Sequence, residues 1–145
     1  TPVPITGQTF GVTLTALMWG RKRATAIILS YLLLGTLGLP IFAMGKSGFS
    51  IGPTTGYLVG MAIATYWMGT MSDWGWTKTW WKSYLIAFSG SLIIFSCGVA
   101  GLSLFIPAKD LLIAGVLPFL PGDFFKTLLS SFIAFQAQRS ISNKT

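Results

Sequence analysis

An acid and a base stand three residues apart in an apolar stretch near the C-terminal end of the chain. The stretch reads PFLPGDFFK, residues 118–126, and holds Asp123 and Lys126. A charged side chain at bilayer depth costs roughly 2.5–3.5 kcal/mol on insertion scales, so an ionisable residue there is a candidate functional site. If a helix starts after Pro121-Gly122, the spacing puts both side chains on one face, within reach of a common ligand. The structural alternative is that Asp123 caps the helix and Lys126 pairs with it.

The composition predicts that this stretch lies in a membrane protein. The chain has 145 residues, of which 52% are hydrophobic and 9% charged, whereas about a quarter are charged in soluble proteins. Charge-free windows at 1–20, 24–45, 47–72 and 83–108 approach or exceed the roughly 20 residues that cross a bilayer. A shorter fifth span, 122–138, begins with the Asp123/Lys126 pair. We therefore predict an all-α integral membrane protein, a single domain over residues 1–145 with a compact bundle of five transmembrane helices.

Several classes of site are excluded by the residues present. There is no histidine and a single cysteine, Cys97, so a disulfide framework or a thiolate metal site is not available, and we expect no cofactor. No stretch resembles a phosphate-binding GxxxxGK[ST] loop. The net charge of +7 is better explained by topology than by nucleic acid, because most basic residues lie in short runs between apolar spans. The chain opens TPVPIT, without a methionine or a signal-peptide pattern, and we expect it to be N-terminally incomplete.

The basic residues predict the orientation in the membrane. Cytoplasmic loops carry an excess of lysine and arginine, and seven bases lie after the first, third and last apolar spans: Arg21, Lys22, Arg23, Lys78, Lys82, Arg139 and Lys144. The other connections hold only Lys46, or Lys109 beside Asp110. We predict that the first residue faces outward and that the C-terminus is cytoplasmic. The tryptophans that flank the basic runs are typical of interfacial anchors: Trp19, Trp74, Trp76, Trp80 and Trp81.

Small residues recur at helical spacing in two of the spans. Gly56, Gly60 and Ala64 lie four apart, as do Ser83, Ala87 and Ser91. Small faces let membrane helices approach closely. The two stripes predict a compact helix bundle, and they say little about function.

Polar residues from four segments are expected at the outward level of the membrane. They are Gln8, Lys46, Tyr57 and the Asp123/Lys126 pair. Each has a structural alternative, since Gln8 can cap a helix, Lys46 can be a solvated loop lysine and Tyr57 can be an interfacial belt residue. Together, a few polar groups among aromatic and aliphatic walls are the usual design of a pocket for a small, partly apolar ligand.

Four ordered motifs resemble a known family over nearly the whole chain. They are PVPITGQTFGV, YLLLGTLGLPIFAMGKSG, GPTTGYLVG and LPFLPGDFFK, and they are similar to the BioY family, the biotin-binding S components of energy-coupling factor (ECF) transporters. The resemblance implies a six-helix protein of a prokaryotic-type cell membrane that captures biotin from outside. The resemblance also implies that the protein hands the vitamin inward by toppling, when it is coupled to a transmembrane T component and paired cytoplasmic ATPases. The resemblance further implies a first helix before the PVPIT-like motif, which we expect to be missing from this chain.

The resemblance also implies a set of binding residues. Its motifs carry the family's glutamine onto Gln8, its outer-loop base onto Lys46, and its aspartate and lysine onto Asp123 and Lys126; Tyr31 and Tyr57 are added as further candidates. Asp123 is expected to accept from the ureido N–H groups of biotin, and Lys46 or Lys126 to meet the carboxylate, with the choice between the lysines open. Apolar walls are expected from Phe10, Phe42, Phe119 and Phe124.

Two rival functions remain beside the biotin-binding subunit, which has no catalytic activity of its own. One is an S component for another vitamin. The other is an intramembrane enzyme that uses Asp123 and Lys126 in acid–base or phosphoryl chemistry, although the chain offers neither a histidine nor a recognisable nucleophile motif.

Overall fold

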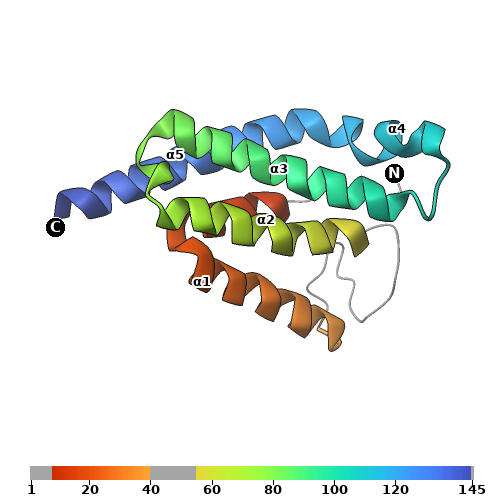
Figure 1. Cartoon of the computed structure of the whole chain (residues 1–145), viewed down its shortest axis with the longest axis horizontal. Helices are drawn as coiled ribbons and strands as arrows, with labels where there is room; N and C mark the ends of the chain where they lie inside the picture. Colours follow the sequence, from red (N-terminus) through yellow and green to blue (C-terminus); the bar gives the residue numbers. More distant parts are fainter. Residues whose placement is uncertain (1–7, 40–54, 145) are drawn as a thin grey trace.

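The structure is a bundle of long helices. The computed structural model describes residues 8–39 and 55–144, and within these ranges every regular element is helical, which confirms the all-α prediction (Figure 1). The helices are α1 (Gln8–Thr36), α2 (Thr55–Asp73), η2 (Trp76–Lys78), α3 (Trp80–Leu102), η3 (Ala108–Asp110), α4 (Leu111–Gly115), η4 (Leu117–Phe119) and α5 (Leu120–Lys144).

Two stretches of the described chain are long and apolar enough to cross a membrane. They are Trp80–Leu102 and Ala108–Ala137. The count of five spans stays a prediction. The second stretch contains Asp123 and Lys126, as the sequence predicted for the last apolar span.

Helix α1 consists of two arms that fold back on each other at Gly20 (Figure 1). Gly20 has φ 82° and ψ 179°, a conformation that is essentially restricted to glycine. The Asp73 carboxylate, at the end of α2, occupies the space that a Cβ of Gly20 would need. Its Oδ2 accepts a hydrogen bond from the backbone N–H of Arg21 at 3.2 Å. Since the first N–H groups of a helix lack partners within it, Asp73 caps the second arm of α1 from a neighbouring helix.

The glycine stripe of α2 packs against α3. A Cβ on Gly60 would lie 3.0 Å from the Cα of Ile94, and one on Gly56 would lie 3.0 Å from the Cα of Gly101. These positions have no room for a side chain, so the two backbones approach closely. The predicted role of the glycines in close helix packing is confirmed.

The second stripe of small residues lies on the face of α3 that meets α5. Ser83, Ala87 and Ser91 are all buried. The Ser83 hydroxyl donates to the backbone carbonyl of Ser131 at 3.3 Å, and the Ser91 hydroxyl donates to Asp123. We call this hydroxyl-rich contact between α3 and α5 the polar seam.

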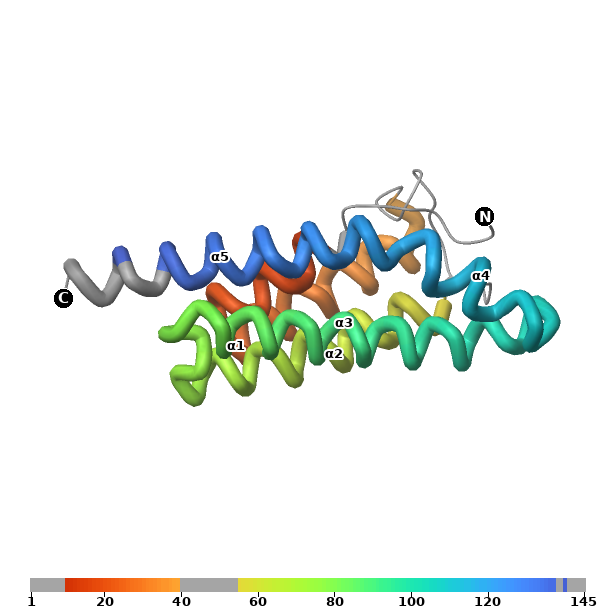
Figure 2. The backbone as a smooth tube through the Cα atoms, turned by 90° about the horizontal axis from the view of Figure 1, so that it is seen from above, coloured from red at the N-terminus to blue at the C-terminus, as the bar shows by residue number. Residues whose placement is uncertain are grey.

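The segments that carry most of the basic residues share one end of the bundle. The turn at Gly20, the η2 connection and the C-terminal end of α5 all lie at the left in Figures 1 and 2, whereas α4 and the first turns of α2 and α5 lie toward the other end. Lys82 stacks on the rings of Trp76 and Trp81, with its Nζ 5.5 Å from each centroid. The predicted tryptophans at this end are exposed. The arrangement is compatible with the predicted topology, in which these segments face the same side of the membrane, and the topology stays a prediction.

Candidate functional site

Asp123 lies in the first turn of α5. The helix begins at Leu120, so the predicted start after Gly122 was late, and Pro121 and Gly122 lie inside the first turn. Proline is tolerated there because its missing N–H would have no helical partner. The positive end of the helix dipole favours an acid at this position.

Two hydroxyls hold the carboxylate of Asp123. Ser91 Oγ donates to Oδ1 at 3.0 Å across the polar seam, and Thr127 Oγ1, one turn further along α5, donates to Oδ2 at 3.4 Å. The Lys126 ammonium adds an electrostatic interaction with the same carboxylate. A carboxylate has about four acceptor positions, so Asp123 retains capacity for N–H donors of a ligand.

Tyr57 is a packing residue at the start of α2. Its side chain is 7% exposed, and its hydroxyl donates to the backbone carbonyl of Gly115 at 2.6 Å. The ring packs against Phe119 with centroids 6.4 Å apart and lies on Gly98, where a Cβ would overlap it. The belt-residue alternative for Tyr57 is therefore wrong, because a belt residue faces the headgroups. Its oxygen can still accept a hydrogen bond from a ligand, so the predicted binding role stays a prediction.

We expect Tyr57→Phe to lower the stability of the protein. The change keeps the ring and leaves the Gly115 carbonyl without its donor, at a cost of about 1–2 kcal/mol. The melting temperature of the purified protein in detergent measures the loss. Tyr84→Phe is the matched control, because the Tyr84 ring stacks on Phe88 near the protein surface with centroids 6.5 Å apart. Equal melting temperatures for the two variants would contradict the assignment.

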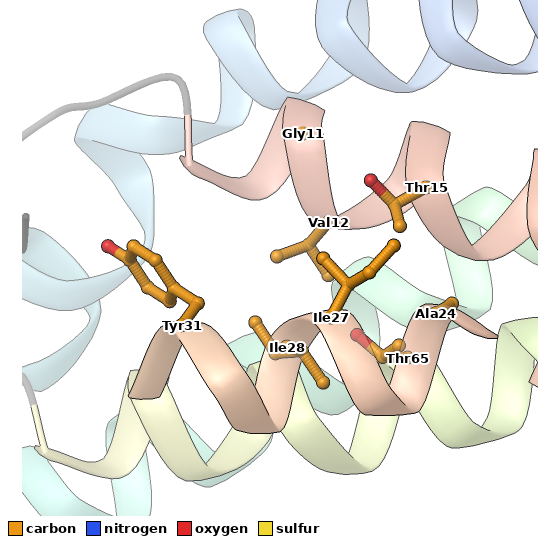
Figure 3. Close-up of a pocket in the computed structure, with 8 residues that line it drawn as sticks. All are labelled: Gly11, Val12, Thr15, Ala24, Ile27, Ile28, Tyr31 and Thr65. Atoms are coloured by element: carbon orange, nitrogen blue, oxygen red, sulfur yellow. The ribbon is translucent and has the colours of Figure 1, made fainter. Parts of the chain in front are cut away.

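Tyr31 lies in a different place, a cavity of about 310 Å³ between the two arms of α1 and α2 (Figure 3). The walls are mostly aliphatic and include Val12, Ile27 and Ile28. In Figure 3 the Tyr31 ring reaches into the gap between the arms. Asp123, Lys126 and Tyr57 do not line this cavity. The structure thus groups Tyr57 and Asp123 around the start of α5 and sets Tyr31 apart, and its predicted role stays a prediction.

The remaining predicted residues are described only in part. Gln8 is the first residue of α1, and its side chain lies outside the described residues, as do Lys46 and Phe42 entirely. Among the predicted apolar walls, Phe119 packs between Tyr57 and Phe95. Phe124 is 52% exposed and stands edge-on to Phe125, and Phe10 is half-buried.

Sequence reasoning missed the role of Ser91 and Thr127 at Asp123. Thr127 could have been found, because it follows Asp123 by four residues and therefore lies on the same helix face. Ser91 was identified only as a small packing residue, since nothing local reveals which residue of α5 it meets. Residues 8–39 and 55–144 contain no cluster of histidine, cysteine or acidic residues that could hold a metal ion.

The fold and the site define a class: a helical membrane protein with a hydrogen-bonded acid and a nearby lysine toward one end of its bundle. Its structure matches the crystal structure of the S-component for biotin from an ECF-type ABC transporter with a TM-score of 0.87 and 27% sequence identity. The match covers 95% of this chain and 77% of that one.

The particular family follows from the sequence comparisons. The model of the BioY family matches residues 1–143, and the chain belongs to the BioY family. The biotin transporter BioY of Thermotoga maritima is 33% identical over 141 residues, which cover 95% of this chain and 82% of the relative. The probable biotin transporter BioY of Pyrococcus horikoshii is 37% identical over 139 residues, which cover 94% and 82%.

Proposed function

We propose that this chain is the biotin-binding S component of an ECF-type vitamin uptake transporter and binds its ligand in an outward-facing pocket. Membership of the BioY family and the S-component fold support the proposal. The observation that carries it is the Asp123 carboxylate, held by two hydroxyls in the first turn of α5 with Lys126 nearby. This is an oriented acceptor beside a cation, and biotin offers N–H donors and a carboxylate.

The proposed roles follow from the chemistry of the ligand. Asp123 accepts from the ureido ring, and Lys126 or Lys46 meets the valeryl carboxylate. Gln8 supplies an amide, which can both donate to and accept from the ligand. Tyr31 and Tyr57 complete the proposed set. The thiophane ring and the aliphatic chain require apolar walls, for which Phe119 and Phe124 are candidates.

The proposed partners are a transmembrane T component and paired cytoplasmic ATPases, which hydrolyse ATP, while this chain has no catalytic activity. The proposed location is a prokaryotic-type cell membrane, crossed several times, with the C-terminus in the cytoplasm. The shared end of the segments that carry the bases supports this orientation. Family membership does not favour the two alternatives, another vitamin or an intramembrane enzyme built on Asp123 and Lys126.

The test is equilibrium binding of biotin and of biotin methyl ester to the purified full-length protein. We expect saturable binding of one biotin, and binding of the ester that is about 10-fold weaker because it lacks the charge a lysine would meet. Lys126→Ala and Lys46→Ala then identify the lysine that meets the carboxylate. Only the variant that lacks this lysine is expected to bind biotin and its methyl ester with the same affinity. Absence of biotin binding by the intact protein would overturn the proposed function.

A further inference from the structure

The buried hydroxyls of α3 and α5 fall into two groups. Ser83, Ser130 and Ser131 each donate to a backbone carbonyl, at 3.3, 3.2 and 2.9 Å. Such bonds join helices or satisfy a hydroxyl within its own turn. Ser91 and Thr127 instead donate to a side-chain carboxylate, that of Asp123. Packing of α3 against α5 does not require hydrogen bonds to a carboxylate, so these two hydroxyls have a role other than helix packing.

The three side chains form a closed polar triangle. Ser91 is 5% and Thr127 3% exposed, and their hydroxyl oxygens lie 3.4 Å apart. Each hydroxyl has one proton, and an ionised carboxylate is the stronger acceptor for it. Ser91 approaches one carboxylate oxygen from α3 and Thr127 approaches the other from within α5.

Two donors on different oxygens fix the plane of the carboxylate. The terminal torsion of an aspartate is broad, so the side chain alone does not specify that plane. A carboxylate that is already held in place raises the affinity for a ligand, because the free energy of binding is then not spent on ordering it.

We propose that Ser91 and Thr127 are positioning residues that hold the Asp123 carboxylate in the orientation in which it recognises the ureido ring of biotin. The proposal rests on the proposed function. The two hydroxyls raise affinity through Asp123 and do not touch the ligand. Ser91 also makes recognition depend on the contact between α3 and α5, because it holds an acceptor on α5 from the neighbouring helix.

We expect Ser91→Ala and Thr127→Val each to weaken biotin binding by about 10-fold, the effect typical of a bond to a charged group. Thr127→Ser keeps the hydroxyl and is expected to bind as the unaltered protein does. Ser83→Ala and Ser130→Ala are matched controls, since both are buried serines of α3 and α5 that donate to the backbone. We expect both to leave the affinity unchanged.

A second ligand separates positioning from a general structural effect. Biotin methylated on its ureido nitrogens cannot donate to Asp123, so Ser91→Ala and Thr127→Val are expected to change its affinity less than 2-fold, however weakly it binds. Likewise, adding Ser91→Ala to Asp123→Asn is expected to lower the affinity for biotin little further, because the effects of substitutions at residues that act through one another are not additive. If the two variants lost affinity equally for biotin and for its methylated form, the hydroxyls would have a general structural role and the proposal would be overturned.

Failure of this inference is distinguishable from failure of the proposed function. Suppose that the unaltered protein binds biotin, and that Ser91→Ala and Thr127→Val bind it with the same affinity as the unaltered protein. The proposed function then stands, and the positioning role is overturned. The positioning role is also overturned if Thr127→Ser loses as much affinity as Thr127→Val, because the methyl group rather than the hydroxyl would then matter. If Ser91→Ala does not fold, Thr127→Val and Thr127→Ser carry the same test on α5.

Discussion

Asp123→Asn is expected to weaken biotin binding by roughly 100-fold, which corresponds to about 2.7 kcal/mol. Asparagine has the same shape, but it removes the negative charge and replaces one acceptor oxygen by an NH₂ donor. The charge-assisted bonds from Ser91 and Thr127 are lost, and so is the acceptor offered to the ureido ring. Isothermal titration of the purified full-length protein measures the change.

The control for this variant is Asp110→Asn, a half-buried acid of η3. We expect its biotin affinity to equal that of the unaltered protein. The melting temperature of Asp123→Asn without ligand separates binding from folding, and we expect it to fall little. If Asp123→Asn bound biotin as tightly as the unaltered protein, the assignment of the site would be wrong.

Gly20→Ala is expected to have the largest effect on folding. Its backbone conformation costs a non-glycine residue about 1–3 kcal/mol, and the new Cβ also displaces the Asp73 carboxylate that caps the second arm of α1. We expect a total loss of roughly 3 kcal/mol and a sharp fall in the yield of folded protein. The yield of monodisperse protein on gel filtration in detergent, together with its melting temperature, measures the loss.

Three other variants divide this cost into its parts. Gly38 has φ 121° with nothing near its Cβ position, so Gly38→Ala tests the backbone conformation alone. Gly11→Ala is the control, because Gly11 has neither a positive φ nor any atom within 4 Å of its Cβ position. We expect this change to leave the stability unchanged or to raise it slightly. Asp73→Asn tests the charge of the cap. A Gly20→Ala protein as stable as Gly11→Ala would contradict the role of the turn.

The sequence predicted those features of the fold that depend on local composition. Apolar length and the Gly56–Gly60 spacing are local properties, so the helical class and the close packing of α2 could be predicted. The cap of Arg21 by Asp73 could not, because the partners are 52 residues apart and meet only once α1 and α2 have packed.

The residues of the candidate site that could be predicted are likewise those that depend on local sequence. Asp123 and Lys126 were found because their spacing on one helix is local, and Thr127 follows the same rule. The contact with Ser91 depends on the register of α3 against α5, which is set by the packing of many side chains and not by any one stretch. The burial of Tyr57 against Gly98 and Phe119 depends on three segments at once, so reasoning from a single segment left a membrane-interface position open beside the predicted binding role.

The cap on the second arm of α1 has a consequence for the order of events during biosynthesis. A chain made from its N-terminus exposes both arms of α1 to the membrane before the end of α2 has been synthesised. Until Asp73 emerges, the Arg21 N–H lacks this acceptor, and the hairpin of α1 is held by its own contacts alone. We therefore expect the hairpin of α1 to gain this cap only after α2 is complete, and a chain that ends before residue 73 to hold the two arms without it.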